Sequence, residues 1–258
     1  MSDALELSYQ EFGQGKPLVI LHGLFGSSTN WRSIAKTLSD SFKVYVLDAR
    51  NHGESPWSDA MTYDAMADDL GHFIEQHELK KPGVIGHSMG GKTAMVAALR
   101  FPELIDRLAI LDIAPVVYSH THAPHIDAMQ NIDLASLKSR TDADVALKPD
   151  IPEAGIRQFL LQNLVYKNGM YSWRINLEVS LRATDDLIGF PELQNNPVYI
   201  HDTLFLYGGL SDYVQPASHQ RIHELFPQAK FKTIENAGHW LHAEQPKLVS
   251  EMLRDFLK

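Results

Sequence analysis

The sequence predicts an α/β fold with a doubly wound, mostly parallel sheet. Short apolar runs recur along the chain, and an amphipathic stretch follows most of them. These runs are continuous rather than alternating, as expected for strands buried on both faces of a parallel sheet. Regular alternation of strand and helix implies right-handed crossovers that place helices on both faces. With 258 residues and 44% apolar composition, the chain can bury a large core without crosslinks.

The predicted elements can be assigned in chain order. LELSYQEFG near the start predicts an antiparallel edge strand. The predicted parallel strands are PLVILHG (17–23), KVYVLDA (43–49), GVIGH (83–87), LAILDIA (108–114), TLFLYGG (203–209) and FKTIENAG (231–238). The predicted helices are NWRSIAKTLSD (30–40), YDAMADDLGHFIEQHEL (63–79), TAMVAALRF (93–101), PASHQRIHELF (216–226) and PKLVSEMLRDFLK (246–258). The last two begin with proline, which suits a first helical turn.

Residues 115–199 interrupt this alternation. Two stretches in this segment, PEAGIRQFLLQNLVY and NLEVSLRATDDLIGF, have a helical pattern. VYKNGMYSW contains an Asn-Gly pair between aromatic flanks, which predicts a small hairpin. We therefore expect a core formed by residues 1–114 and 200–258, with a helical cap at 115–199. Such a cap would cover the carboxyl edge of the sheet, where open α/β sheets bind ligands.

Composition excludes several classes of function. The chain has no cysteine, so it forms no disulfide and has no thiolate nucleophile or thiolate metal ligand. A net charge of −9 argues against nucleic acid as a partner, because phosphate backbones bind basic surfaces. The first residues do not resemble a signal peptide, and no apolar run approaches the roughly 18 residues of a membrane span. We expect a cytoplasmic enzyme acting on a small molecule.

Ser88 is the predicted nucleophile. It lies in Gly86-His87-Ser88-Met89-Gly90, between a predicted strand and a predicted helix. In a strained strand-to-helix elbow the residues two before and two after the serine crowd each other, which requires both to be small. The helix that follows directs its N-terminal N–H groups and dipole toward the serine, where they favour negative charge. An inert glycine turn is the alternative, and the strand and helix on either side favour the nucleophile.

A serine nucleophile needs a general base, and His239 is the candidate. It follows the last predicted strand in ENAGHWLHAEQP, and His242 is the rival in the same segment. We expect His242 to cap the final helix or to pack against it, because it lies nearer that helix than His239 does. Of the other histidines, His22, His52 and His87 lie at strand ends and are interpreted as structural. The run SHTHAPH, with His120, His122 and His125, matches no zinc spacing, so we expect a polar loop and no metal.

The loop LHGLFGSSTNW provides candidate donors for an oxyanion hole. The backbone N–H of Leu24 or Phe25 can act together with that of Met89, the residue after the serine. Gly23 and Gly26 allow this loop to run close to a substrate.

Five segments together resemble the α/β-hydrolase superfamily, and more narrowly the small bacterial carboxylesterases of the YbfF type. They are HGLFGSSTNW, DARNHGESP (48–56), GHSMGG (86–91), LDIAP (111–115) and NAGHWLHAE (236–244). The resemblance implies an eight-stranded mostly parallel sheet, a helical cap after strand six, and ester hydrolysis without a cofactor. Ser88 and His239 match the family's nucleophile and base, and Leu24 and Met89 match its oxyanion donors.

Two aspartates are candidates for the acid that orients His239. Asp212 in GGLSDYVQP follows the seventh strand of the implied fold, the usual superfamily position. Asp112 in LDIAP follows the sixth, and the YbfF-like esterases resemble this chain there. Either strand end could bring a carboxylate to the imidazole, so topology leaves both open. The narrower resemblance favours Asp112, with Asp212 as the alternative.

The expected activity is hydrolysis of short- to medium-chain acyl esters, with acyl thioesters as a further substrate class. A serine-dependent carbon–carbon bond hydrolase or an acyltransferase on the same fold is the alternative. Aromatic side chains of the cap, and of the loop that carries His239 (the base loop), are the candidates for substrate contact: Phe159, Tyr166, Trp173 and Trp240. Packing of the cap on the core is the alternative role for the aromatic residues of the cap. Arg50 to His52 together with Lys92 are interpreted as structural, with a basic patch for an anionic substrate such as an acyl-CoA as the alternative.

Overall fold

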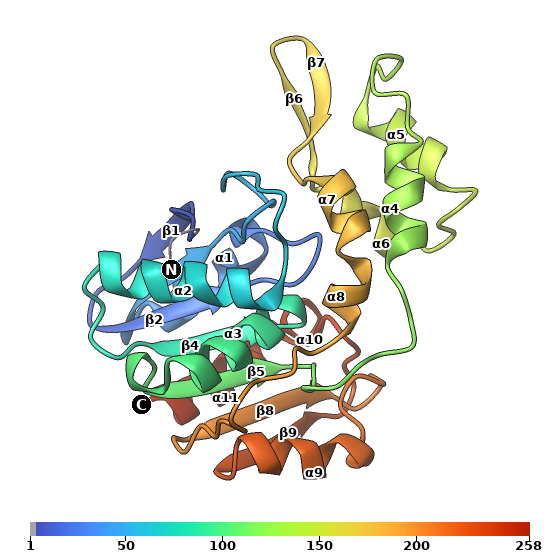
Figure 1. Ribbon diagram of the computed structural model, residues 1–258. Coiled ribbons are helices and arrows are strands. Elements are labelled where there is room, and N and C mark those ends of the chain that lie inside the picture. The colour runs from blue at the N-terminus through green and yellow to red at the C-terminus, as the bar shows by residue number, and fades with distance from the viewer. Residues whose placement is uncertain (1–3) are drawn as a thin grey trace.

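A seven-stranded sheet forms the centre of the computed structural model, which describes residues 4–258 (Figure 1). Its strands are β1 (Tyr9–Phe12), β2 (Lys16–Leu21), β3 (Phe42–Leu47), β4 (Gly83–His87), β5 (Arg107–Leu111), β8 (Thr203–Gly208) and β9 (Ala229–Ile234). They are ordered β1-β3-β2-β4-β5-β8-β9. Only β1, at one edge, pairs antiparallel, and the other neighbours are parallel. The predicted edge strand and parallel sheet are therefore confirmed.

The sheet has seven strands within the described residues, where the resemblance implies eight. Upstream of β1, side chains from other segments satisfy the backbone. The Leu5 N–H donates to Asp69 at 2.7 Å and the Ser8 N–H donates to Ser55 at 2.8 Å. These bonds occupy groups that an additional strand would need for pairing. The predicted cap at 115–199, from here on called the insertion, therefore follows β5, which is the fifth strand of the sheet, rather than a sixth strand.

Helices cover both faces of the sheet. They are α1 (Arg32–Leu38) after the 3-10 turn η1 (Ser28–Trp31), α2 (Tyr63–Gln76), α3 (Met89–Arg100) before η2 (Pro102–Leu104), α9 (Pro216–Leu225), α10 (Leu241–Glu244) and α11 (Pro246–Leu257). Successive residues of β2 alternate between two cores: Val19 packs with the α2, α3 and α9 side, and Ile20 with the α1 and α11 side. The doubly wound arrangement follows from this alternation. No helix of the described part combines the length and apolarity that crossing a bilayer requires.

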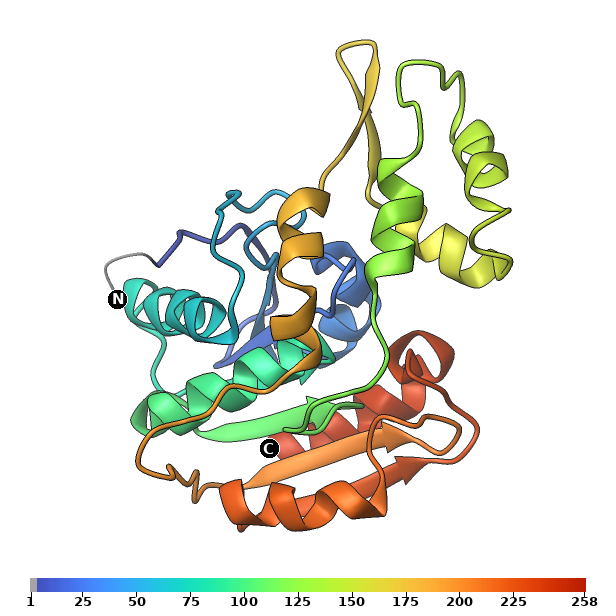
Figure 2. The same cartoon turned by 45° about the vertical axis from the view of Figure 1, so that its right-hand side comes forward.

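The chain between β5 and β8 forms a separate group of elements above the sheet (Figures 1 and 2). They are α4 (Ala123–Gln130), α5 (Arg140–Leu147), α6 (Ala154–Leu161), β6 (Leu164–Lys167), β7 (Met170–Trp173), α7 (Leu177–Arg182) and α8 (Thr184–Ile188). The predicted hairpin is present, and its turn residues Asn168 and Gly169 have φ of 54° and 83°, as an Asn-Gly turn requires. The short helices α4 and α5 are not predicted by the sequence pattern.

The sheet reverses its winding direction at β2. The chain passes from β2 to β3 on one side and then to β4 on the other. The carboxyl ends of β2 and β4 therefore diverge from a topological switch point, where ligands bind in open α/β sheets. The segment 22–26 and Ser88 follow these two strand ends directly.

Candidate active site

Ser88 occupies a sharp turn between β4 and α3. Its φ of 51° and ψ of −120° are unfavourable for a residue with a side chain, at a cost of about 1–3 kcal/mol. The turn presses Gly86 against Gly90: a Cβ on Gly86 would lie 2.3 Å from the Gly90 carbonyl oxygen. A Cβ on Gly90 would lie 2.5 Å from the His22 carbonyl oxygen instead, so both positions need glycine, and the crowding predicted between the two explains Gly86. The turn leaves Ser88 on the wall of a cavity, with α3 beginning immediately behind it.

His239 lies on the turn between β9 and α10, and its imidazole meets a buried carboxylate. The His239 Nδ1 is 2.8 Å from Oδ2 of Asp112, which follows β5 and is fully buried. The same carboxylate accepts hydrogen bonds from the Gly208 N–H at 3.0 Å and from the Ser211 hydroxyl. Because the Asp112 carboxylate accepts a hydrogen bond from the Nδ1–H of His239, the Nε2 of His239 is the nitrogen available as a base. His239 and Ser88 line the same cavity.

Asp212, the alternative acid, points elsewhere. Its carboxylate is exposed to solvent and accepts a 3.4 Å hydrogen bond from the Gln215 side chain. Its loop reaches the site through the preceding residue, Ser211, which donates to Asp112. Of the two acids left open by the sequence, the structure brings Asp112 to His239.

Tyr213 is a site residue that the sequence reasoning missed. Its ring stacks on the His239 imidazole, with centroids 4.0 Å apart and planes 18° apart. Its hydroxyl lies 2.7 Å from Nε2 of His120, and its carbonyl accepts a 2.8 Å bond from the Tyr118 hydroxyl. Burial raises the pKa of Tyr213 to about 12 and lowers the pKa of His120, so the phenol donates to a neutral imidazole. Its position beside Asp212 was the only signal available in the sequence.

The candidate oxyanion donors lie beside Ser88. Leu24 and Met89 both border a small cavity that also touches Ser88, and Phe25 lines the main cavity. Phe25 has a φ of 62°, and its carbonyl accepts a 2.7 Å bond from the Asn163 side chain, which fixes the loop against the insertion. None of the hydrogen bonds described for residues 4–258 uses the backbone N–H of Leu24, Phe25 or Met89. They are therefore available to an oxygen at Ser88.

A cavity of about 370 Å³ opens in front of Ser88 and His239. Phe159 from α6 and Trp240 from the turn before α10 line it, with ring centroids 5.6 Å apart. Both residues are among the predicted substrate contacts. The base loop and the insertion therefore each contribute an aromatic side chain to the wall of the cavity.

The other two predicted substrate contacts, Tyr166 and Trp173, do not line this cavity. They belong to the β6–β7 hairpin, whose strands pair with each other and project away from the sheet (Figure 1). Tyr166 is 64% exposed and packs on Tyr171 across the hairpin at 4.9 Å. Trp173 is partly buried and pairs with Leu164. The aromatic content of the hairpin thus serves cross-strand packing.

Burial keeps the other histidines near the site neutral. It lowers the pKa in each of four: His22, His52, His87 and His242. The rival base His242 stacks on Trp31 at 4.5 Å with a plane angle of 5°, consistent with the packing role expected from the sequence. The His87 Nε2 donates to the backbone carbonyl of His239 at 2.8 Å and so holds the base loop.

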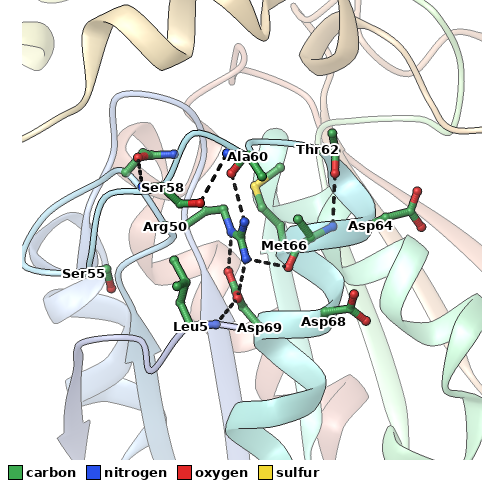
Figure 3. A network of polar contacts seen from close by, with 12 residues as sticks. Leu5, Arg50, Ser55, Ser58, Ala60, Thr62, Asp64, Met66, Asp68 and Asp69 are labelled. Carbon is green, nitrogen blue, oxygen red and sulfur yellow. Dashed lines mark hydrogen bonds and ion pairs between the residues drawn. The ribbon is translucent and has the colours of Figure 1, made fainter. Parts of the chain in front are cut away.

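Arg50 belongs to a buried network rather than to a surface patch (Figure 3). Its Nε and Nη2 each donate to Asp69 at 2.7 Å, and its Nη1 donates to the Ala60 carbonyl at 2.9 Å. Both members of the ion pair are 1% exposed. Burial raises the pKa of Asp69, while the bonds from Arg50 and from the Leu5 N–H act in the opposite direction. The network fixes the loop after β3 against α2.

Lys92 is also buried, one turn after Ser88. Its ammonium donates to the carbonyls of Val116 at 3.0 Å, Ile188 at 2.9 Å and Gly189. The first carbonyl lies where the chain enters the insertion, and the other two lie where it leaves. With Arg50 and Lys92 both 1% exposed, the basic patch is contradicted and the structural interpretation holds.

His120, His122 and His125 all line the main cavity. The sequence predicts a loop for this run, but α4 begins at Ala123, so His125 is helical. Burial lowers the pKa of His122 to about 4 and also lowers that of His125. Within residues 4–258 no group of three or more histidine, cysteine or acidic side chains is arranged to hold a metal ion.

Comparisons with known proteins show the family to which the chain belongs. The family described as alpha/beta hydrolase fold matches residues 16–246. The chain is 44% identical over 250 residues to the sn-1-specific diacylglycerol lipase ABHD11 of Mus musculus, covering 93% of this chain and 80% of the relative. It is 36% identical over 242 residues to esterase YbfF of Escherichia coli K12, covering 93% and 92%. A solved structure, a marine microorganism esterase, superposes with a TM-score of 0.95 at 42% identity, covering 98% of this chain and all of that one. The chain belongs to the α/β-hydrolase fold family, among the ester hydrolases of the YbfF type.

Proposed function

We propose that this chain is a serine carboxylesterase that hydrolyses short- to medium-chain acyl esters through Ser88, His239 and Asp112. The observation that carries the proposal is the 2.8 Å hydrogen bond from His239 Nδ1 to the buried Asp112, in a site where His239 and Ser88 line one cavity. A base oriented by a carboxylate beside a serine on a strained turn is the arrangement that acyl transfer to serine needs.

The first half of the reaction acylates the enzyme. Ser88 Oγ attacks the ester carbonyl carbon while His239 Nε2 takes the hydroxyl proton. The N–H groups of Leu24 and Met89 bind the oxyanion of the tetrahedral intermediate, and the N-terminus of α3 adds its dipole. Asp112 stabilises the imidazolium that forms. The intermediate collapses when His239 gives its proton to the leaving oxygen, releasing the alcohol and leaving an acyl-serine.

The second half releases the acid. A water gives a proton to His239 and attacks the acyl carbon, and collapse of the second intermediate returns that proton to Ser88 Oγ. His87 and His242 are less suited to this transfer, because the His87 Nε2 donates to the His239 carbonyl and His242 stacks on Trp31, and burial lowers the pKa of both. His239 is therefore the one base assigned to the cycle.

Turnover of p-nitrophenyl acetate by the wild-type chain and by Ser88→Ala tests the proposal. We expect Ser88→Ala to lose at least about 10³-fold in kcat, because the covalent step has no other nucleophile. Circular dichroism and the unfolding midpoint serve as controls, since the Ser88 hydroxyl makes no capping hydrogen bond to α3. A folded variant that keeps more than a few per cent of the wild-type rate would overturn the assignment. Product analysis in the presence of an added alcohol distinguishes hydrolysis from acyl transfer.

A further inference from the structure

The loop that carries the Leu24 N–H contains a strained turn. The Gly26 N–H donates to the Gly23 carbonyl at 2.9 Å, which closes a turn over Leu24 and Phe25. Phe25 has a φ of 62°, in the left-handed region where a turn favours glycine. Such a conformation costs free energy for a residue with a side chain, and it persists where surrounding contacts fix it. The direction of the Leu24 N–H therefore depends on the contacts that hold this turn.

One of these contacts comes from the insertion. The Asn163 amide donates to the Phe25 carbonyl at 2.7 Å and to the Leu160 carbonyl at 3.2 Å. Asn163 is 1% exposed and lies between α6 and β6. Because Leu160 belongs to α6, the second bond fixes the amide on that helix. The insertion thus binds the carbonyl of the strained residue itself.

Two more side chains of the insertion hold the segment that follows the turn. Arg174, directly after β7, donates from Nη2 to the Ser27 hydroxyl at 3.0 Å and to the Thr29 hydroxyl at 3.4 Å. The Gln162 side chain, directly before β6, accepts a 2.5 Å bond from the Asn30 amide. The base of the β6–β7 hairpin therefore contacts successive parts of residues 25–30.

We infer that the base of the β6–β7 hairpin sets the geometry of the oxyanion hole, with Asn163 and Arg174 as positioning residues. The inference rests on the proposed function, from which it takes the oxyanion role of Leu24. Neither positioning residue lines the cavity at Ser88, so each acts through the turn that directs the Leu24 N–H. The hairpin strands stand away from the sheet (Figures 1 and 2), and it is their base that serves the reaction.

A misdirected oxyanion donor affects the transition state more than the substrate complex. Negative charge develops on the carbonyl oxygen as Ser88 attacks, and a donor must lie about 3 Å from the position that this oxygen then occupies. A change in the direction of the Leu24 N–H should therefore lower kcat and leave KM nearly unchanged. Loss of a contact that only stabilises the insertion should lower the unfolding midpoint and leave kcat unchanged.

Asn163→Ala and Arg174→Met test the inference with p-nitrophenyl acetate as substrate. For each variant we expect kcat to fall about 10- to 10²-fold, with KM within about twofold of the wild type. A trifluoromethyl ketone forms a hemiketal with the serine, and its oxyanion occupies the same hole as that of the intermediate. Its affinity should fall by about the same factor as kcat/KM.

Asn176→Ala is the matched control. Asn176 is another asparagine of the insertion, and its amide donates at 3.3 Å to Asn51, in the loop after β3 rather than in residues 22–30. Its side chain also caps α7 by accepting from the Val179 N–H, so its loss should lower stability. We expect a lower unfolding midpoint, with kcat and the affinity for the ketone within about twofold of the wild type.

The outcomes separate this inference from the proposed function. Folded Asn163→Ala and Arg174→Met variants that lose no more kcat than Asn176→Ala, or that change KM instead, overturn the positioning role while ester hydrolysis by Ser88 stands. If one of the two variants does not fold, the other decides, because both act on the same loop. No turnover by the wild type, with no fluorophosphonate adduct on Ser88, overturns the proposed function and the inference with it.

Discussion

At the scale of single residues, hydrogen-bond donors surround the carboxylate of Asp112, which therefore acts as an acceptor. Its backbone has a φ of 51°, so it turns sharply out of β5 toward the base loop. Its two oxygens accept from Gly208, Ser211 and His239, all while fully buried. Three donors around a buried carboxylate offset the cost of removing it from water.

We expect Asp112→Asn to lower kcat by roughly 10²–10⁴-fold, because an amide no longer stabilises the imidazolium or fixes the tautomer of His239. Asp212→Asn is the matched control, one residue from Ser211 on the neighbouring loop, and it should stay within a few-fold of the wild type. Steady-state kinetics on p-nitrophenyl acetate, with unfolding midpoints for both variants, make the comparison. Greater damage from Asp212→Asn would transfer the role to Asp212.

The two aspartates also illustrate what sequence can and cannot predict about a site. Ser88 and His239 are marked by local context, an elbow between glycines and the loop after the last strand. Asp112 and Asp212 both follow strands that end at the same edge of the sheet. Only the direction of each side chain decides which carboxylate reaches His239, and the sequence does not show that direction. Tyr213 has no local signal, because its stacking partner is 26 positions away, at His239.

At the scale of elements, Lys92 fastens the insertion to the core. Its three carbonyl partners belong to the two chain crossings that begin and end the insertion, and they are 24, 96 and 97 residues away in sequence. Because Lys92 lies in the first turn of α3, the helix that begins directly after Ser88 also holds both ends of the insertion. Burial lowers the pKa of Lys92 to about 7, which reflects how fully its ammonium is removed from water.

Lys92→Met should destabilise the protein and affect all esters alike. The substitution keeps the length of the side chain and removes every donor, and each buried carbonyl left unpaired costs about 1–3 kcal/mol. We expect a lower unfolding midpoint and a lower kcat/KM, by the same factor for a neutral ester and for an acyl-CoA. Lys148→Met, an exposed lysine of the insertion, is the control. A loss confined to the acyl-CoA would restore the basic-patch interpretation.

Strands, turns and helices with a strong local sequence pattern could be predicted from the sequence. The remaining elements are determined by tertiary contacts, which a local pattern does not show. The strand at 83–87 coincides with β4, and the Asn-Gly pair predicts the β6–β7 turn. The eight-residue helices α4 and α5 are too short for a helical period to stand out, and α4 begins inside a histidine run that favours a loop. The interior of the insertion was therefore the least predictable part of the fold.

At the scale of the whole molecule, the buried histidines link stability to pH. Burial lowers the pKa of His52 and His242 to about 3 and that of His122 to about 4, from an ordinary value of 6.5. Below pH 6.5 the unfolded chain therefore binds protons that the folded chain does not. Stability is lost as the pH falls from about 6.5 toward the folded values, by up to about 1.4 kcal/mol per pH unit for each histidine.

Thermal unfolding between pH 7 and pH 5 measures this linkage. We expect the midpoint to fall with pH, and we expect His242→Phe to reduce the slope, because phenylalanine preserves the stack on Trp31 and takes up no proton in the unfolded chain. The relevant comparison is the slope, since the variant shifts the absolute midpoint as well. Equal slopes in the two proteins would show that His242 is not held neutral by the fold.

Ser88 is the proposed nucleophile and His239 its proposed base. Incubation with a fluorophosphonate, followed by intact mass and peptide mapping, tests this directly. We predict a single phosphonyl group on Ser88, no adduct in Ser88→Ala, and labelling slowed by at least about 10²-fold in His239→Ala. An adduct on any other residue, or rapid labelling without His239, would contradict the account.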